Sequence, residues 1–154
     1  MSSGNIRELF RERGYSEDIN NRNAILEVLD ALNIGENSEL GTFYLACVPE
    51  VLRSKTSMEQ LNGAVVVLAD DTVQPDPDPF ETPVGMATLF VREVWNIPET
   101  FICLTSTEGE GAYLFDLSSH GVFDFDLNEQ SALCEGILEP RWKSFFEFLE
   151  WYLA

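Results

Sequence analysis

Two short segments in the C-terminal half of the chain alternate in polarity and are separated by a four-residue turn. Residues 113–117 read Tyr-Leu-Phe-Asp-Leu and residues 122–126 read Val-Phe-Asp-Phe-Asp, with Ser-Ser-His-Gly between them. A period of two is typical of strands, and a short turn of small and polar residues joins antiparallel neighbours. The sequence therefore predicts a β-hairpin with one apolar face and one largely acidic face.

Helical patterns lie on both sides of this hairpin. Apolar spacing predicts a short first helix that breaks near Gly14 and a clearer second helix that ends at Gly35. Pro49 is placed at the first turn of a further helix that runs towards Met58. A last helix follows Pro140 and carries a wide apolar stripe that packs on the sheet.

The remaining strands are expected after residue 62, where β-branched and aromatic runs are punctuated by Gly, Pro and Asp. The predicted strands are residues 64–69, 86–94, 100–106, 112–117 and 122–126. Residues 74–79 read Gln-Pro-Asp-Pro-Asp-Pro and predict an exposed, extended loop, because proline has no amide hydrogen. Helices that flank a mainly antiparallel sheet give an α+β fold, and 154 residues suit a single domain, residues 1–154.

The charge is unevenly distributed along the chain. The formal net charge is −18, and residues 56–140 hold sixteen acids against one base, Arg92, a net charge of −15. Such a field repels nucleic acid and anionic lipid and speeds the encounter with a basic protein, although it equally serves as a solubilising surface. No apolar run is long enough to cross a bilayer and the first residues lack a signal-peptide core, so a cytoplasmic location is expected.

The acids with the most suggestive positions are two pairs of aspartates. Asp76 and Asp78 lie in the proline-rich loop, and Asp124 and Asp126 project from one face of a predicted strand. These four residues are the predicted partner-binding residues. Either pair, or Asp70-Asp71, is also compatible with a calcium or magnesium site, but none matches an EF-hand loop and a solvated surface is the preferred explanation.

The sequence predicts no catalytic, metal or cofactor site. His120 is the one histidine and lies in the predicted turn, where an exposed polar residue needs no special reason. Cys47, Cys103 and Cys134 are far apart and are interpreted as small buried hydrophobic residues. Residues 109–111, Gly-Glu-Gly, are interpreted as a turn, because no lysine follows that would complete a phosphate-binding loop.

Five fragments occur in an order that is similar to a known family. They are Val-Pro-Glu at 48–50, Leu-Asn-Gly at 61–63, Ile-Pro at 97–98, Gly-Glu-Gly-Ala-Tyr-Leu-Phe-Asp-Leu at 109–117 and Ser-Phe-Phe-Glu-Phe-Leu at 144–149. Together they resemble the SUKH superfamily of immunity proteins and cell-wall regulators. Two features depart from the family pattern: Glu110, where its turn carries Gly-Asp, and the proline-rich loop.

The resemblance implies an α+β domain that binds and neutralises a toxin, frequently a nuclease, while eukaryotic relatives regulate cell-wall synthesis. It implies no catalytic residues. The leading hypothesis is therefore an acidic protein-binding module, a bacterial immunity protein whose partner is a basic toxin. The alternatives are a metal-dependent enzyme that uses the same carboxylates with His120, or a regulatory scaffold.

Overall fold

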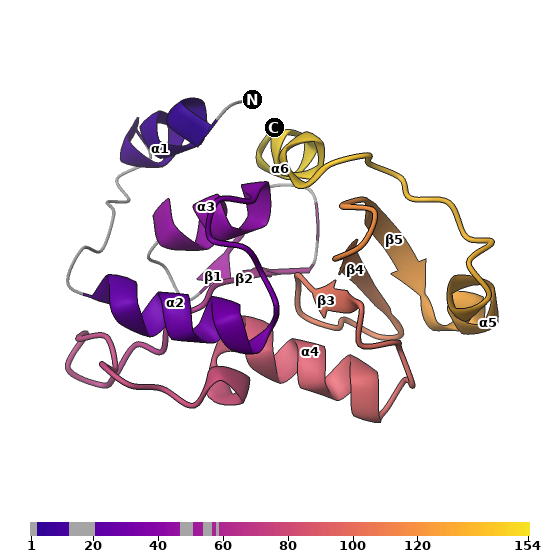
Figure 1. The fold of residues 1–154 in the computed structure, drawn as a ribbon, viewed down its shortest axis with the longest axis horizontal. Coiled ribbons are helices and arrows are strands. Elements are labelled where there is room, and N and C mark those ends of the chain that lie inside the picture. The colour runs from indigo at the N-terminus through magenta and orange to yellow at the C-terminus, as the bar shows by residue number, and fades with distance from the viewer. Residues whose placement is uncertain (1–2, 13–20, 47–50, 54–56, 58) are drawn as a thin grey trace.

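A computed structural model describes residues 3–12, 21–46, 51–53, 57 and 59–154 of the chain (Figure 1). It confirms the α+β fold, with helices at both ends and a mainly antiparallel sheet between them. In chain order the elements are α1 (Ser3–Glu12), α2 (Arg22–Ala31), α3 (Glu39–Ala46), β1 (Val51–Leu52), β2 (Leu61–Asn62), η2 (Pro79–Glu81), α4 (Pro83–Glu93), β3 (Phe101–Cys103), β4 (Gly111–Asp116), β5 (Val122–Asp126), η3 (Leu127–Glu129), α5 (Gln130–Cys134) and α6 (Phe145–Leu153). Among the helices described, none is long and apolar enough to cross a membrane.

The predicted hairpin is confirmed, and it supplies two of the three strands of the main sheet, with β4 at the centre. Strands β3, β4 and β5 pair antiparallel in that order, with Leu114 opposite Phe123 across the hairpin. Strands β1 and β2 form a second antiparallel pair. A bridge between Leu61 and Thr105 joins this pair to the chain that leaves β3, so that the strands lie next to one another.

The sheet lies between two apolar layers. In Figure 1, helices α1, α3 and α6 lie above the strands and α4 lies below them. Along β4, Tyr113 and Phe115 belong to the core with α1, α2, α3 and α6, whereas Ala112 and Leu114 belong to a second core with α4 and α5. The prediction of a largely acidic face is therefore wrong for β4, because helices cover both of its faces.

Residues 86–94 were predicted as a strand, and this prediction is wrong because they lie in and directly after α4. Thr82 caps this helix: its hydroxyl accepts a hydrogen bond from the N–H of Gly85 at 3.2 Å, and Pro83 occupies the first helical turn. A side chain at Gly85 would meet the carbonyl oxygen of Pro79, so the close packing of η2 on α4 requires glycine.

Three other predictions are corrected. Residues 64–69 form no strand; a single bridge between Val67 and Val73 closes a tight loop instead. The helix expected after Pro49 is contradicted by strand β1, while Pro49 and Met58 themselves lie outside the described residues, as do Gly14 and Cys47. In the 74–79 loop Asp76 and Asp78 are exposed, but Pro77 is buried and Pro79 begins η2.

Candidate functional site

Both predicted aspartates of β5 are exposed, and each is engaged by a neighbouring group. Asp124 forms an ion pair with Arg141, with 2.8 Å between its Oδ2 and the arginine Nη1. Asp126 caps η3: its carboxylate accepts from the N–H of Asn128 at 3.0 Å, while Glu129 accepts from the N–H of Asp126 at 3.1 Å. Each aspartate therefore has a local structural role.

The two aspartates of the proline-rich loop lie elsewhere. Asp78 caps η2 by accepting a hydrogen bond from the N–H of Phe80 at 2.9 Å, and Asp76 is exposed. The segment that precedes α4 extends to the left of the molecule in Figure 1, whereas β5 lies on the right. The two pairs of aspartates therefore lie on different elements of the fold, Asp76 and Asp78 before η2 and Asp124 and Asp126 on β5.

His120 lies in the turn between β4 and β5, as predicted. Its φ is 66°, it is exposed, and its ring centroid is 6.0 Å from that of Phe115. It lines a cavity of about 80 Å³ together with Glu39, whose carboxylate accepts a hydrogen bond from the N–H of Phe146 at 2.8 Å. Glu39 thus holds the first turn of α6, and this small cavity has the character of a packing gap.

The same turn contains a hydrogen-bonded carboxylate. Asp116 accepts from both the N–H and the hydroxyl of Ser118, at 2.9 and 2.7 Å, and from the hydroxyl of Ser119 at 2.9 Å. Partial burial raises the pKa of Asp116, but these hydrogen bonds outweigh it, and the pKa lies below the ordinary value. The ionised carboxylate therefore stabilises the turn.

The cysteines differ in exposure. Cys103 is buried, and burial raises the pKa of its thiol to about 12. Cys134 is exposed, so its interpretation as a buried hydrophobic residue is wrong. Among the residues described, no group of three or more His, Cys, Asp or Glu side chains is placed to hold a metal ion.

The acids of residues 56–140 are all at the surface. Of the sixteen, none is buried; most are exposed, and Glu59, Asp116 and Glu129 are half-buried. The single base of this segment, Arg92, is itself half-buried, and its Nη2 donates to the carbonyl oxygens of Glu99 and Phe101 at 2.8 and 3.2 Å. Its guanidinium therefore anchors the end of α4 to the start of β3 and the residues just before it.

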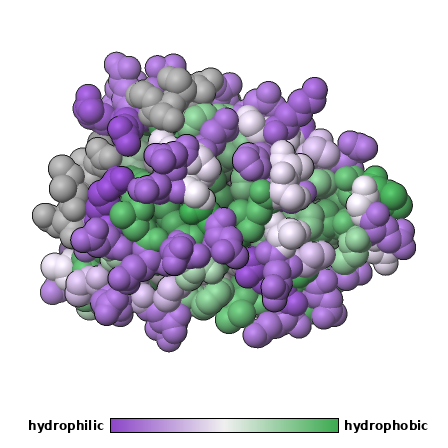
Figure 2. Space-filling model, in the orientation of Figure 1, coloured by the Kyte–Doolittle hydropathy of each residue, from purple (hydrophilic) through white to green (hydrophobic). Residues whose placement is uncertain are grey.

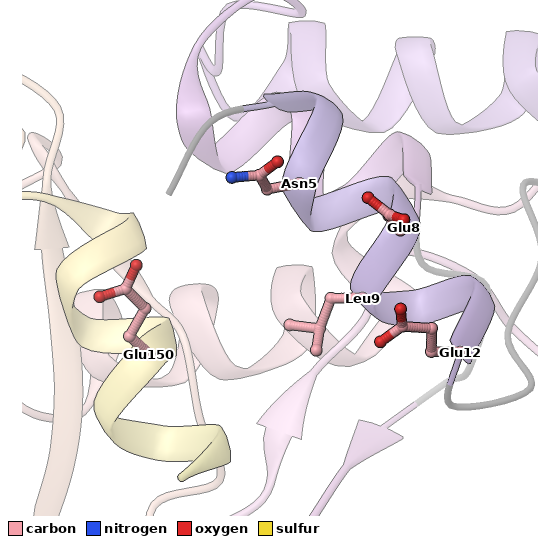
Figure 3. Close-up of a pocket in the computed structure, with 5 residues that line it drawn as sticks. All are labelled: Asn5, Glu8, Leu9, Glu12 and Glu150. Carbon is pink, nitrogen blue, oxygen red and sulfur yellow. The ribbon is translucent and has the colours of Figure 1, made fainter.

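Further acids line a cavity of about 340 Å³ between α1 and α6 (Figure 3). Glu8 and Glu12 come from α1 and Glu150 from α6, and Leu9 points into the gap between the helices. Asn5 completes the lining. The acidity of the surface is therefore not confined to the strand-rich half of the molecule.

A cavity beside an exposed apolar surface lies along α4, and the sequence interpretation missed it. It has a volume of about 440 Å³ and is lined by Asn62, Glu81, Pro83, Met86, Ala87, Phe90, Ser106 and Thr107. Figure 2 shows apolar side chains in green over α4, at the lower edge of this face, among hydrophilic ones. We call this cavity the α4 groove. The spacing of Met86, Phe90 and Val94, four residues apart, is the sequence signal that would have revealed it once a helix had been recognised.

Comparisons with known proteins found no matching family model, no matching curated protein and no matching solved structure.

Proposed function

We propose that the protein is a protein-binding module that neutralises a basic partner, and that it acts as an immunity protein of the SUKH type against a toxin. One observation carries the proposal: sixteen acids in residues 56–140 all reach the surface, while the only base of that segment donates its hydrogen bonds to backbone carbonyls. The order of the five SUKH-like fragments supports the same function.

The negative charge of the surface acts mainly on the rate of association. A surface with this excess of negative charge raises the encounter rate with a cationic protein about 10- to 1000-fold at low salt, and screening removes most of the gain once the Debye length falls to about 8 Å at physiological ionic strength. Nuclease toxins must bind phosphate groups and are therefore commonly basic, which makes them suitable partners. Tight binding additionally requires an apolar anchor.

The experiment measures association with the protein encoded beside the gene of this chain. Rate constants are measured at several salt concentrations for the native protein and for a variant in which Asp76, Asp78, Asp124 and Asp126 are changed to Asn. The matched control removes four carboxylates outside residues 56–140, through Glu8→Gln, Glu12→Gln, Glu27→Gln and Asp30→Asn.

We expect the four-aspartate variant to associate more slowly than the control, with a weaker dependence on salt, and the native protein to restore growth of cells that express the toxin. Equal slowing in both variants would show that total charge matters and the four positions do not. A neighbouring protein that neither binds nor is inhibited would contradict the immunity function.

A further inference from the structure

Three exposed apolar side chains form a stripe along α4. Met86 is 56 % exposed, Phe90 39 % and Val94 59 %. They are four residues apart, so they lie on one face of the helix and of its last turn. The opposite face, with Val84, Thr88 and Val91, is buried against the sheet. The stripe is therefore a second apolar face on a helix that already packs on the sheet through its opposite face.

The surroundings of the stripe are polar and negative. Glu81 lines the α4 groove at the start of the helix. Glu93 is exposed and follows Met86 by seven residues, which places it on the same helical face. Arg92 donates to the carbonyl oxygens of Glu99 and Phe101, so its guanidinium is held at the end of α4 that adjoins β3. The α4 groove therefore has one carboxylate in its lining, that of Glu81, and the exposed carboxylate of Glu93 lies on the same helical face beyond it.

This combination selects one kind of occupant. A second copy of the chain would bring another net charge of −18 to the contact, and anionic membranes or nucleic acids would be repelled in the same way. A segment that presents an apolar side chain between lysines or arginines complements both the apolar stripe and these two carboxylates.

The geometry points to the α4 groove as the docking site for such a cationic, amphipathic segment of a partner protein. In it, the apolar side chain contacts Met86, Ala87 and Phe90, and the basic side chains face Glu81 and Glu93. This inference rests on the proposed function. It places the apolar anchor that tight binding of the partner requires in the α4 groove, whose lining includes none of the four aspartates.

The test uses the full chain and a defined probe, a synthetic amphipathic peptide with leucines at helical spacing and lysines on the flanks. Two control peptides replace the leucines with serine or the lysines with glutamate. Binding is followed by chemical-shift changes of the backbone amides. The variants are Met86→Ser, Phe90→Ser and the pair Glu81→Gln with Glu93→Gln; the matched control is Leu68→Ser, at an exposed leucine on the 68–72 turn that is 41 % exposed.

We expect the shifts to cluster at residues 81–94 and 106–107, and Met86→Ser to weaken binding about tenfold, which corresponds to the loss of one buried side chain. Two controls test specificity. The Leu68→Ser variant should bind the probe peptide as tightly as the native protein does, and neither control peptide should bind the native protein. If Phe90→Ser unfolds the protein because Phe90 also packs on Trp95, the Met86 and glutamate variants decide.

The inference is overturned if the probe does not bind, if the shifts lie outside the groove, or if Leu68→Ser weakens binding as much as Met86→Ser. Failure of the proposed function is a separate result. If a basic neighbouring protein binds the Met86→Ser variant and the native protein equally, the proposed function stands and the docking role of the α4 groove is refuted. If the peptide binds in the α4 groove but the protein inhibits no toxin, the immunity function is refuted and the docking role of the groove stands.

Discussion

Tyr44 and Tyr152 have almost the same exposure and different hydroxyl environments, so the change from Tyr to Phe should affect them differently. Both side chains are buried, with 1 % and 0 % of their surface exposed. The Tyr152 hydroxyl accepts from the N–H of Leu61 at 3.0 Å and lies 2.9 and 2.8 Å from the carbonyl oxygens of Leu52 and Glu59, between which its proton is shared. The Tyr44 hydroxyl has no hydrogen-bond partner in the part of the chain that the structure describes.

The magnitudes follow from these contacts. Tyr152→Phe leaves a buried N–H and at least one buried carbonyl without this partner, at about 1–3 kcal/mol for each group that stays unsatisfied, and we expect a loss of about 2–4 kcal/mol. For a chain of this length that lowers the melting temperature by about 5–15 °C. Tyr44→Phe removes a buried hydroxyl that no described residue hydrogen-bonds, so the free energy of unfolding should stay unchanged or rise by about 1 kcal/mol.

The assay is urea unfolding followed by the fluorescence of Trp95, Trp142 and Trp151, with thermal unfolding as a second measurement. Each variant keeps its aromatic ring, so the pair differs only in what the hydroxyl contacts. The reasoning is refuted if both variants lose the same free energy, or if Tyr44→Phe destabilises the protein by more than about 1 kcal/mol, the usual net contribution of a hydrogen bond.

Three other outcomes are expected. Gly85→Ala should lower the free energy of unfolding in urea by about 1–3 kcal/mol, because the added methyl group would overlap a carbonyl oxygen of η2. Gly35→Ala is the control: its methyl group has space, so its free energy of unfolding should stay within about 0.5 kcal/mol of the native value. Partial burial raises the pKa of Asp116, but the hydrogen bonds of the turn outweigh this effect and bring the pKa below the ordinary value. The ionised Asp116 therefore stabilises the fold fully above the ordinary carboxyl pKa, and this stabilisation is lost as the pH falls through the lowered pKa. Urea midpoints measured from neutral to acidic pH should accordingly fall less steeply for Asp116→Asn than for the native protein. In peptide mapping after brief alkylation of folded protein, Cys134 should be modified and Cys103 protected, because Cys103 is buried and burial raises the pKa of its thiol to about 12; equal labelling would contradict the burial.

The hairpin was predictable because its signal is local. Strand β5 has the predicted bounds, and β4 differs from its prediction by one residue at each end. What the alternation did not reveal is that β4 is covered on both faces. The covering of the second face depends on α4, which was predicted as a strand at residues 86–94. An apolar run of that length does not by itself distinguish a strand from a buried helix.

The misassigned helix also explains why the α4 groove was missed. The Thr82-Pro83 pair is a readable start signal for a helix, and once it is used the apolar run divides into a buried face and an exposed stripe. The ion pair of Asp124 with Arg141 was not predictable in this way, since the two residues meet only when the chain after α5 returns to β5. By contrast, Asp126 and Glu129 have the spacing of a capping box, which local sequence does indicate.

The helix-capping roles of two aspartates decide how the charge hypothesis must be tested. Asp78 and Asp126 each accept a hydrogen bond from a backbone N–H, so alanine at either position would remove a charge and a cap together. Asparagine removes the charge but retains a side-chain oxygen that accepts the same hydrogen bond. If binding weakens in the alanine variants and not in the asparagine variants, these residues act on the partner through local structure. If both sets weaken binding equally while the asparagine variants keep native stability, the negative charge itself is what the partner recognises.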